Sequence, residues 1–506
     1  MHKYRAMRSR QKGRCAVSQR SVKGSHELRG TELRNRTMSI AGRFPLLGWF
    51  YPSITMLLML YAGTQQTSLL LVAMLCMGIY IAISSAESNF YLLVFLLPSL
   101  SLFVTEQADS SYATMLFLAA LVKHVASRIS SMKLHVAGLL GVLGIIVLEL
   151  LHLFTYLSDW LSPTVRWIAL MLYASLLIID MSFKPSFKRA VYTFTCGIFV
   201  SSACGLVMSV TSELTSAPFR RFEGVGGDPN GFGMMVLMAA FFLLHLYKQA
   251  RQPNTLLVYS SLGLLLLGLT TLSRTYFLTM GFMVLLLLGY MAVTADRNSI
   301  RMRSKMIAAV AILGAVFAIP VMNLVQSIIE RMSIGSSLDK MTGSRSFLAE
   351  QYWTVFRDSS LWELLVGRGI IGYLPQSRIS VHGQQMGPHN TYLESLVAWG
   401  LVGTVIFIAF VLLLAYVQRI KSGTVVVRTE TWLESSRSKP SFLAFLPIIS
   451  TMIFLLSLHS LGMYTTYFYI VLLIMNLYYT EPESVERMEG IGSSGTVPAE
   501  RGSGRI

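Results

Sequence analysis

Charged residues are scarce in this chain. Of its 506 residues, 42 are Lys or Arg and 25 are Asp or Glu, so 13% are charged, whereas 53% are hydrophobic. In a soluble domain about a quarter of the residues are usually charged. This composition therefore excludes an ordinary soluble protein and predicts a membrane protein. We interpret the formal net charge of +17 as a topology signal, and we expect no nucleic-acid partner.

Cysteines and catalytic signature motifs are also few. The chain has no Asp-x-Asp, no phosphate-binding Gly-x-x-x-x-Gly-Lys and no Gly-x-Ser-x-Gly motif. These absences argue against metal-assisted, ATP-driven and serine-hydrolase chemistry, and we expect neither a metal site nor a cofactor. Neither a disulfide scaffold nor a zinc site is predicted, because the four cysteines lack the necessary spacing: Cys15, Cys76, Cys196 and Cys204.

Long apolar runs dominate what is present. Residues 1–43 form a basic polar segment that predicts a disordered cytosolic tail, and residues 481–506 predict a second flexible cytosolic tail. Residues 44–480 between them are the predicted transmembrane domain, an all-α polytopic fold with about 12–14 spanning helices of about 20 residues each. Fourteen runs are candidates: 45–62, 68–84, 88–104, 111–127, 134–154, 165–180, 188–210, 229–248, 255–272, 275–294, 304–325, 390–416, 441–459 and 462–479.

The connections between these runs differ in charge in a regular way. From residue 128 onward, Lys and Arg recur in alternate connections, beginning with Arg128 and Lys133, whereas the short connections 63–67, 105–110 and 155–164 have none. By the positive-inside rule, both termini are therefore cytosolic. The long connection of about 326–389 then lies outside.

The first candidate site lies where an outer loop becomes a membrane helix. Asp228 suits the N-cap and Pro229 the first helical position, so the positive end of the helix dipole faces outward. The paired arginines Arg220 and Arg221 lie alongside, on the side that topology disfavours for positive charge. We interpret this segment as an anion site, against the alternative of an ordinary cap and loop. Three glycines permit close backbone approach to a ligand: Gly224, Gly226 and Gly227.

The second candidate site opens the helix after the long loop. Thr391 and Glu394 have capping-box spacing, which leaves His389 just outside another outward-facing helix start. We expect the positive dipole end to keep the imidazole neutral, as a general base must be. His382 and His459 rank below His389 because neither adjoins a helix start that could hold the same anion.

Three weaker features complete the candidates. Arg274 lies between two apolar runs, where a cation faces a polar interior more often than lipid, and snorkelling to the surface is the alternative. Helical spacing over 344–365 predicts an amphipathic helix that either lies on the outer membrane surface or caps the bundle. Glu149 and His152, one turn apart, are a low-ranked proton pair.

These motifs, taken in order, resemble those of the O-antigen ligase and polymerase superfamily of bacterial membrane glycosyltransferases. The similarity covers about residues 190–410, and its specificity lies in the order and common outer placement of motifs that are individually weak. The motifs are Arg221 to Gly224, Asp228 to Asn230, Ser273-Arg274, Gly343 to Arg345, Gly367 to Gly369 and His389 to Glu394.

The resemblance implies a GT-C-like helical bundle with a long extracytoplasmic loop in the cytoplasmic (inner) membrane. It implies transfer of a glycan from undecaprenyl diphosphate to an acceptor hydroxyl on the outer face, with inversion and without a metal. Arg221 and Arg274 would bind the diphosphate, with Arg220 as a competitor for the first role, and His389 would position or deprotonate the acceptor. Further site candidates are Arg345, Asp228, Asn230, Asn390 and Glu394.

Three functions follow from the sequence in decreasing order. The first is a polymerase that joins lipid-linked oligosaccharide repeats, with the growing glycan as acceptor and the bilayer, a chain-length regulator and a flippase as expected partners. The second is a ligase that moves a finished glycan to a lipid or protein. The third is a transporter or flippase of lipid-linked sugar, which we rank low because the predicted midplane is nearly uncharged and no halves repeat.

Overall fold

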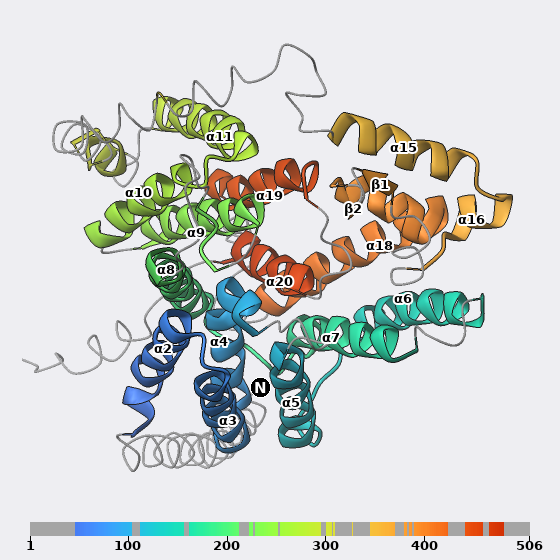
Figure 1. Ribbon diagram of the computed structural model, residues 1–506, viewed down its shortest axis with the longest axis horizontal. Coiled ribbons are helices and arrows are strands. Elements are labelled where there is room, and N and C mark those ends of the chain that lie inside the picture. Colours follow the sequence, from blue (N-terminus) through green and yellow to red (C-terminus); the bar gives the residue numbers. More distant parts are fainter. Residues whose placement is uncertain are drawn as a thin grey trace, which may run out of the picture. The chain divides into compact units, whose positions relative to one another are not determined.

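The computed structural model describes most of the apolar core of the chain (Figure 1). The described residues form two compact units, one of residues 46–61 and 65–76 and the other of residues 62–64 and 77 onward. The structure describes these ranges: 46–103, 112–155, 161–211, 222–225, 228–250, 254–294, 300–305, 307–308, 326, 345–369, 379–381, 384–386, 389–423, 441–458 and 465–479.

Helices make up nearly all of the described structure. A single two-stranded hairpin, β1 (Ile379–Val381) with β2 (Gln384–Met386), pairs Ile379 with Met386 in antiparallel register within the long connection. The helices are α2 (Leu46–Thr64), α3 (Thr67–Ile83), α4 (Ala86–Leu96), η1 (Leu97–Phe103), α5 (Tyr112–Arg128), α6 (Val136–Thr155), α7 (Leu161–Ile179), α8 (Phe187–Thr211), α9 (Pro229–Gln249), α10 (Thr255–Leu269), α11 (Arg274–Val293), α15 (Arg345–Arg357), α16 (Leu361–Val366), α18 (Thr391–Gly423), α19 (Phe442–Leu455) and α20 (Thr465–Leu477).

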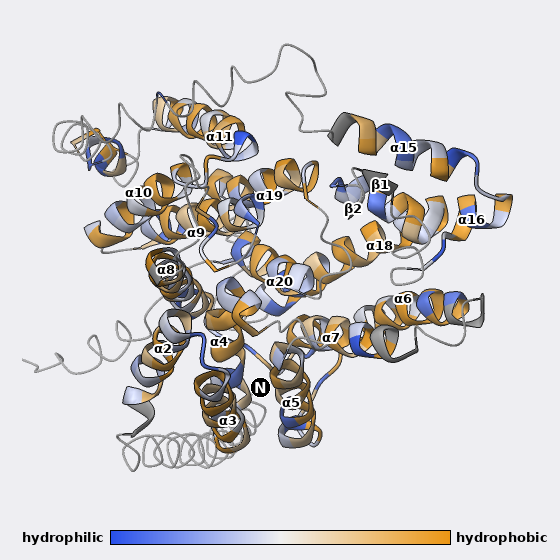
Figure 2. Ribbon diagram, in the orientation of Figure 1, coloured by the Kyte–Doolittle hydropathy of each residue, from blue (hydrophilic) through white to orange (hydrophobic). Residues whose placement is uncertain are grey.

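The predicted all-α polytopic membrane fold is confirmed. Every predicted apolar run that falls on described residues is a helix, whereas most of the run at 304–325 lies outside them. Figure 2 shows apolar residues along α6, α18 and α20, and a mixed surface on α15. By length and composition, five described helical stretches can cross a membrane: Ala86–Phe103, Phe187–Val210, Pro229–Gln249, Arg274–Val293 and Thr391–Gly423.

Helix α9 is the central element of the larger unit, because most of its side chains are buried. It packs against α10 and α19. Thr451 of α19 contacts Met238 of α9, and Tyr469 of α20 contacts Met235. The start of α19 lies at the other end of α9, because the Ala444 carbonyl accepts from Asn476 of α20, so α19 runs opposite to α9 and α20 runs along it. At the other end, Asn476 of α20 bonds His245 of α9 over 2.7 Å. The starts of α9 and α20 therefore share one end of the bundle with the end of α19.

Helix α18 begins at that same end. The Thr391 hydroxyl donates to the Leu458 carbonyl over 2.8 Å, and the Tyr392 hydroxyl donates to the Met452 carbonyl over 3.0 Å. Both acceptors belong to the last part of α19 or to the residues just after it. We call this the outer end, after the orientation that the loop charges predict.

A kink divides α18 at Gly400, whose φ of 61° is in the left-handed region that favours glycine. The chain of α16 lies directly against this kink, since a Cβ at Gly400 would come within 2.5 Å of the Leu365 backbone. Two backbone hydrogen bonds join the elements: the Arg368 amide donates to Val397 and the Gly369 amide donates to Ala398 over 2.7 Å. The Gly367 to Gly369 motif is thereby a packing element for α18.

The prediction of one amphipathic helix over 344–365 is wrong in one respect. The structure has two helices, α15 and α16, because a capping box at Ser360 and Glu363 starts a new helix. Leu348, Tyr352 and Phe356 of α15 are buried, as the helical spacing predicted.

Candidate active site

The start of α9 is capped as predicted. The Asp228 carboxylate accepts hydrogen bonds from the Asn230 amide at 2.9 Å and the Gly231 amide at 3.1 Å, and Pro229 occupies the first turn. The first four amide positions of a helix have no partner within the helix, and this carboxylate accepts hydrogen bonds from two of them. Asp228 is thus a residue that fixes the helix start at the outer end.

The start of α11 joins the start of α9 directly. Ser273 caps α11, accepting a hydrogen bond from the Tyr276 amide at 3.2 Å, and its hydroxyl donates to the Asn230 side chain over 2.5 Å. Both Asn230 and Ser273 are buried. The two motifs that lie 43 residues apart in the sequence are therefore in contact. Arg274, half-buried, is the first residue of α11 at this junction.

The two paired arginines lie just before this junction. Arg220 and Arg221 are outside the described residues, so their predicted roles stay predictions. The next residue, Phe222, donates its amide hydrogen to the Thr270 carbonyl over 3.1 Å, which ties the segment to the turn that precedes Arg274. Phe222 therefore lies beside the α10–α11 connection.

The predicted role of the glycines needs a correction at Gly224. Its φ of +61° requires glycine, but its backbone approaches Gly205 of α8, where an added Cβ would come within 2.3 Å of the Gly224 oxygen. The Ser101 hydroxyl donates to the Val225 carbonyl as well. Close approach at Gly224 packs the loop on the bundle. Gly226 and Gly227 lie outside the described residues.

His389 lies two residues before α18, at the outer end. It is half-buried and has a φ of +46°, a left-handed conformation that a non-glycine residue seldom adopts. Such local backbone strain is concentrated at functional sites, so the observation motivates a functional role for His389. His382 and His459 lie outside the described residues.

The predicted capping box of Thr391 with Glu394 is wrong. The cap is Asn390, whose side-chain oxygen accepts from the amides of Tyr392 and Leu393, each at 3.1 Å. The Thr391 hydroxyl instead bonds to Leu458, as described above. Glu394 is fully buried and its amide donates to the Asn390 carbonyl over 2.9 Å.

Two further outer arginines, Arg345 and Arg368, belong to the α15–α16 segment and not to the starts of α9 and α11. Arg345 begins α15, and its side chain is outside the described structure. Arg368 forms an ion pair with Glu363 over 3.1 Å and bonds to the Ser359 hydroxyl over 3.3 Å. The positive charge of Arg368 therefore has a structural partner within the α15–α16 segment.

Sequence reasoning did not connect α6 with α18. The Trp399 indole donates a hydrogen bond to the Glu149 carboxylate, and both side chains are buried. His152 bonds through Nε2 to the Val366 carbonyl at 2.9 Å. Glu149 and His152, the low-ranked proton pair, thus each have a partner in the α16–α18 region. Partners separated by more than 200 residues leave no local signal in the sequence.

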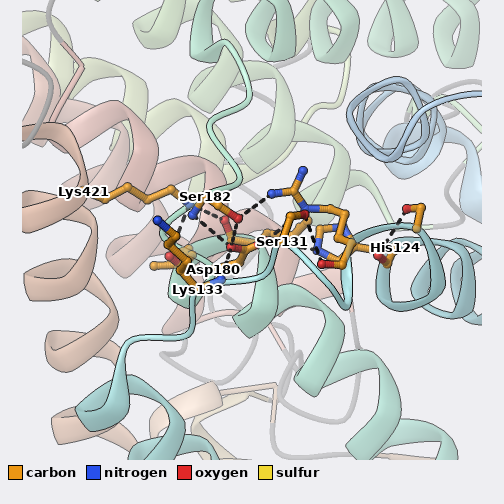
Figure 3. Close-up of polar contacts among 10 residues, drawn as sticks. His124, Ser131, Lys133, Asp180, Ser182 and Lys421 are labelled. Carbon is orange, nitrogen blue, oxygen red and sulfur yellow. Dashed lines mark hydrogen bonds and ion pairs between the residues drawn. The ribbon is translucent and has the colours of Figure 1, made fainter. Parts of the chain in front are cut away.

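A second polar cluster lies at the opposite end of the bundle, which we call the inner cluster (Figure 3). Asp180, fully buried, accepts from Arg128 Nε at 3.0 Å and from the Ser182 amide at 2.9 Å. Lys421 donates to the carbonyls of Leu177 and Ile178 at the end of α7. Although burial raises it, hydrogen bonds from Ser182, Arg128 and the Lys133 amide hold the pKa of the Asp180 carboxyl below its usual value.

Within the described ranges, no group of three or more His, Cys, Asp or Glu side chains is placed to hold a metal ion. A family model described as O-antigen ligase matches residues 256–408. The match runs from α10 into α18 and includes Arg274, Arg368 and His389. It confirms the resemblance to the O-antigen ligase and polymerase superfamily. A search of curated proteins found no match.

Proposed function

On the premise of this family match, we propose that the protein is a metal-independent, inverting glycosyltransferase of the cytoplasmic membrane that polymerises undecaprenyl-diphosphate-linked oligosaccharide repeats into a surface polysaccharide. Both termini are cytosolic in this proposal, and transfer occurs on the outer face. The main alternative is a ligase that uses the same donor chemistry but delivers a finished glycan to a lipid or protein.

One observation carries the proposal: the hydrogen bond between Ser273 and Asn230. It joins two capped helix starts, and each start directs the positive end of its helix dipole to the same region. Arg274 begins the second of these helices. A diphosphate is the kind of ligand that such a junction stabilises, because helix starts and guanidinium groups both favour multiple negative charges.

The chemistry assigned to this region needs no metal. As the acceptor oxygen bonds to the anomeric carbon, the bond to the diphosphate oxygen breaks and the diphosphate takes the electron pair. Arg221 and Arg274 stabilise that growing charge, with Arg220 as the competitor for the first role. His389 accepts the proton of the acceptor hydroxyl, because a base at a helix start is favoured in its neutral form.

A reconstituted transfer assay distinguishes the candidates. Purified protein in lipid nanodiscs is given lipid-linked repeats together with a chelator. We expect a ladder of longer lipid-linked chains and release of undecaprenyl diphosphate. Transfer only to an added lipid or protein acceptor, without a ladder, would identify a ligase. Movement of intact donor across a bilayer, without any new glycosidic bond, would support the transporter alternative and contradict the proposal.

A further inference from the structure

The short helix α16 exposes large apolar side chains. Leu361 is 73% exposed and Trp362 is 57% exposed, and Leu365 on the next turn is also exposed. Trp353 of the preceding helix α15 adds a second exposed indole. An apolar patch of this kind is costly in water and marks a surface that something apolar covers.

The depth of α16 follows from its bonds to α18. Gly369 and Arg368 bond to Ala398 and Val397, which lie about two turns into α18 (Figure 1). The stretch of α18 after the Gly400 kink, residues 401–423, is about 35 Å long and is by itself sufficient for a bilayer core of roughly 30 Å, which needs about 20 residues. The part of α18 before the Gly400 kink consequently lies near the membrane boundary, and α16 lies beside it.

The exposed surface of α16 adjoins the exposed apolar side of α18. The Leu365 backbone lies against Gly400, and the next residue of α18, Leu401, is exposed. Val405 and Leu412 continue the exposed apolar side chains down the helix. Helix α18 is long and apolar enough to cross a membrane, and in that position lipid is what these exposed side chains would face. The lipid that contacts α18 there is therefore also close enough to contact the exposed apolar side chains of α16.

The residue types agree with a position at the membrane surface. Tryptophan is enriched where the acyl chains meet the headgroups, since its ring is apolar and its N–H can bond to polar groups. Arg357, the last residue of α15, forms an ion pair over 3.0 Å with Asp358, which follows it, and both side chains are mostly exposed. The charged end of α15 and the apolar α16 thus form an amphipathic surface over a few residues.

We propose that α16, with Trp353 of α15, is an interfacial element that inserts Leu361, Trp362 and Leu365 into the phospholipid leaflet at which α18 begins. The occupant of this surface is the bilayer, and neither a partner protein nor a second copy of the chain covers it. This element is distinct from the transfer site, and the proposal holds whichever glycosyl acceptor the protein uses.

Fluorescent labels at single cysteines test the proposal. In a cysteine-free full-length chain, an environment-sensitive fluorophore is attached at Leu361→Cys or Trp362→Cys. The matched controls are Val405→Cys in the span and Asp358→Cys, whose side chain is 60% exposed. The nanodiscs contain phosphatidylethanolamine and phosphatidylglycerol, with or without a lipid that carries a spin label near the headgroup end of its acyl chain.

We expect blue-shifted emission and strong spin-label quenching at positions 361 and 362, comparable with position 405, and water-like emission with weak quenching at 358. Water-like emission at both α16 positions would overturn the proposal. Blue-shifted emission without quenching would also overturn it, because protein and not lipid would then cover the patch. Two labelled positions are used so that a fold defect in one variant, detected by size-exclusion chromatography, still leaves a decisive reading from the other.

Discussion

The two ends of the bundle use polar side chains differently. In the inner cluster, the buried carboxylate of Asp180 faces cations of the chain itself. Arg128 lies at 3.0 Å, and Lys421 of α18 bonds to a carbonyl at the end of α7 close by. At the outer end, the polar side chains of Asp228, Ser273 and Asn390 bind backbone amides at the starts of α9, α11 and α18.

This difference separates a structural role from a functional one. A carboxylate that neutralises its own cations forms a closed unit, and buried units of this kind fix helix packing. A carboxylate or hydroxyl that caps a helix instead holds the helix start in place while leaving its dipole directed outward. We therefore expect changes in the inner cluster to alter stability, and changes at the outer end to alter transfer.

The largest expected effect is at His389. His389→Ala should lower transfer by about 10²- to 10⁴-fold, the usual contribution of a general base. Because alanine is strained at a φ of +46°, His389→Asn is the better test, since asparagine tolerates this conformation. Transfer is measured as chain growth, and donor binding is measured separately.

The control for His389 is His382→Ala, which should be nearly silent. If both His389 variants lose donor binding as much as transfer, His389 is a diphosphate ligand and not a base. If polymer still forms at the normal rate in the His389 variants, His389 has no role in transfer, and the functional role assigned to the outer end is contradicted.

Removing the inner carboxylate should destabilise the fold without altering the chemistry. Asp180→Ala removes a buried acceptor from the half-buried Arg128 and from the Lys133 and Ser182 amides, and donors left without a partner cost about 1–3 kcal/mol. The matched change Asp358→Ala breaks an exposed pair and should cost only about 0–1 kcal/mol. Thermal unfolding in nanodiscs measures both variants. A low turnover per folded molecule in Asp180→Ala would contradict a purely structural role.

The lowered pKa of Asp180 adds a pH dependence to this prediction. A folded-state pKa below the unfolded one stabilises the protein above the unfolded pKa, and this contribution is lost as the pH falls through the folded pKa. The wild-type advantage over Asp180→Ala should therefore be complete at neutral pH and shrink below about pH 4. If the stability difference between wild type and Asp180→Ala instead shrinks as the pH is raised from neutral, the lowered pKa of Asp180 is contradicted.

Arg274→Lys tests whether this outer-end arginine takes part in transfer. Lysine keeps the charge but loses the planar fork, so we expect a loss of transfer on the order of 10²-fold. Arg357→Lys, at an exposed ion pair on the same side, is the matched control and should keep normal activity. Normal transfer by Arg274→Lys would remove Arg274 from the proposed site.

The smallest effect is expected at Ser273. Ser273→Ala removes the α11 cap and leaves Asn230 without this bond, at a cost of about 1–2 kcal/mol. Ser360→Ala removes the cap of α16, which lies away from the junction. Both variants lose one helix cap. A low transfer rate in Ser273→Ala with a normal rate in Ser360→Ala would show that the contact between α9 and α11 matters for transfer. Equal transfer in both variants would contradict its importance.

Local patterns were sufficient to predict most helices and one helix start. Apolar runs predicted the spans because burial in lipid requires them, and Asp228-Pro229 predicted a cap that depends on neighbouring residues alone. The cap at Asn390 was missed because Thr391 and Glu394 offered a competing local pattern. The Ser360 to Glu363 capping box was visible in the sequence and would have divided the amphipathic helix correctly.

The contacts that build the candidate site were beyond local patterns. Asn230 meets Ser273 across 43 residues, and Trp399 meets Glu149 across 250. Helix packing decides such pairs, and many partners are equally compatible with the sequence near each residue. The motifs indicated which residues matter, but only the fold shows which of them touch.

Membrane orientation is the most direct test of the central claim, that transfer occurs at the outer end. Single cysteines replace Ser336 and Ser422 in a cysteine-free chain, and a membrane-impermeant thiol reagent is applied to right-side-out vesicles. The account predicts labelling at position 336 in intact vesicles and at position 422 only after permeabilisation, because Lys and Arg concentrate in the connection that follows α18. Labelling of position 422 but not 336 in intact vesicles would contradict it.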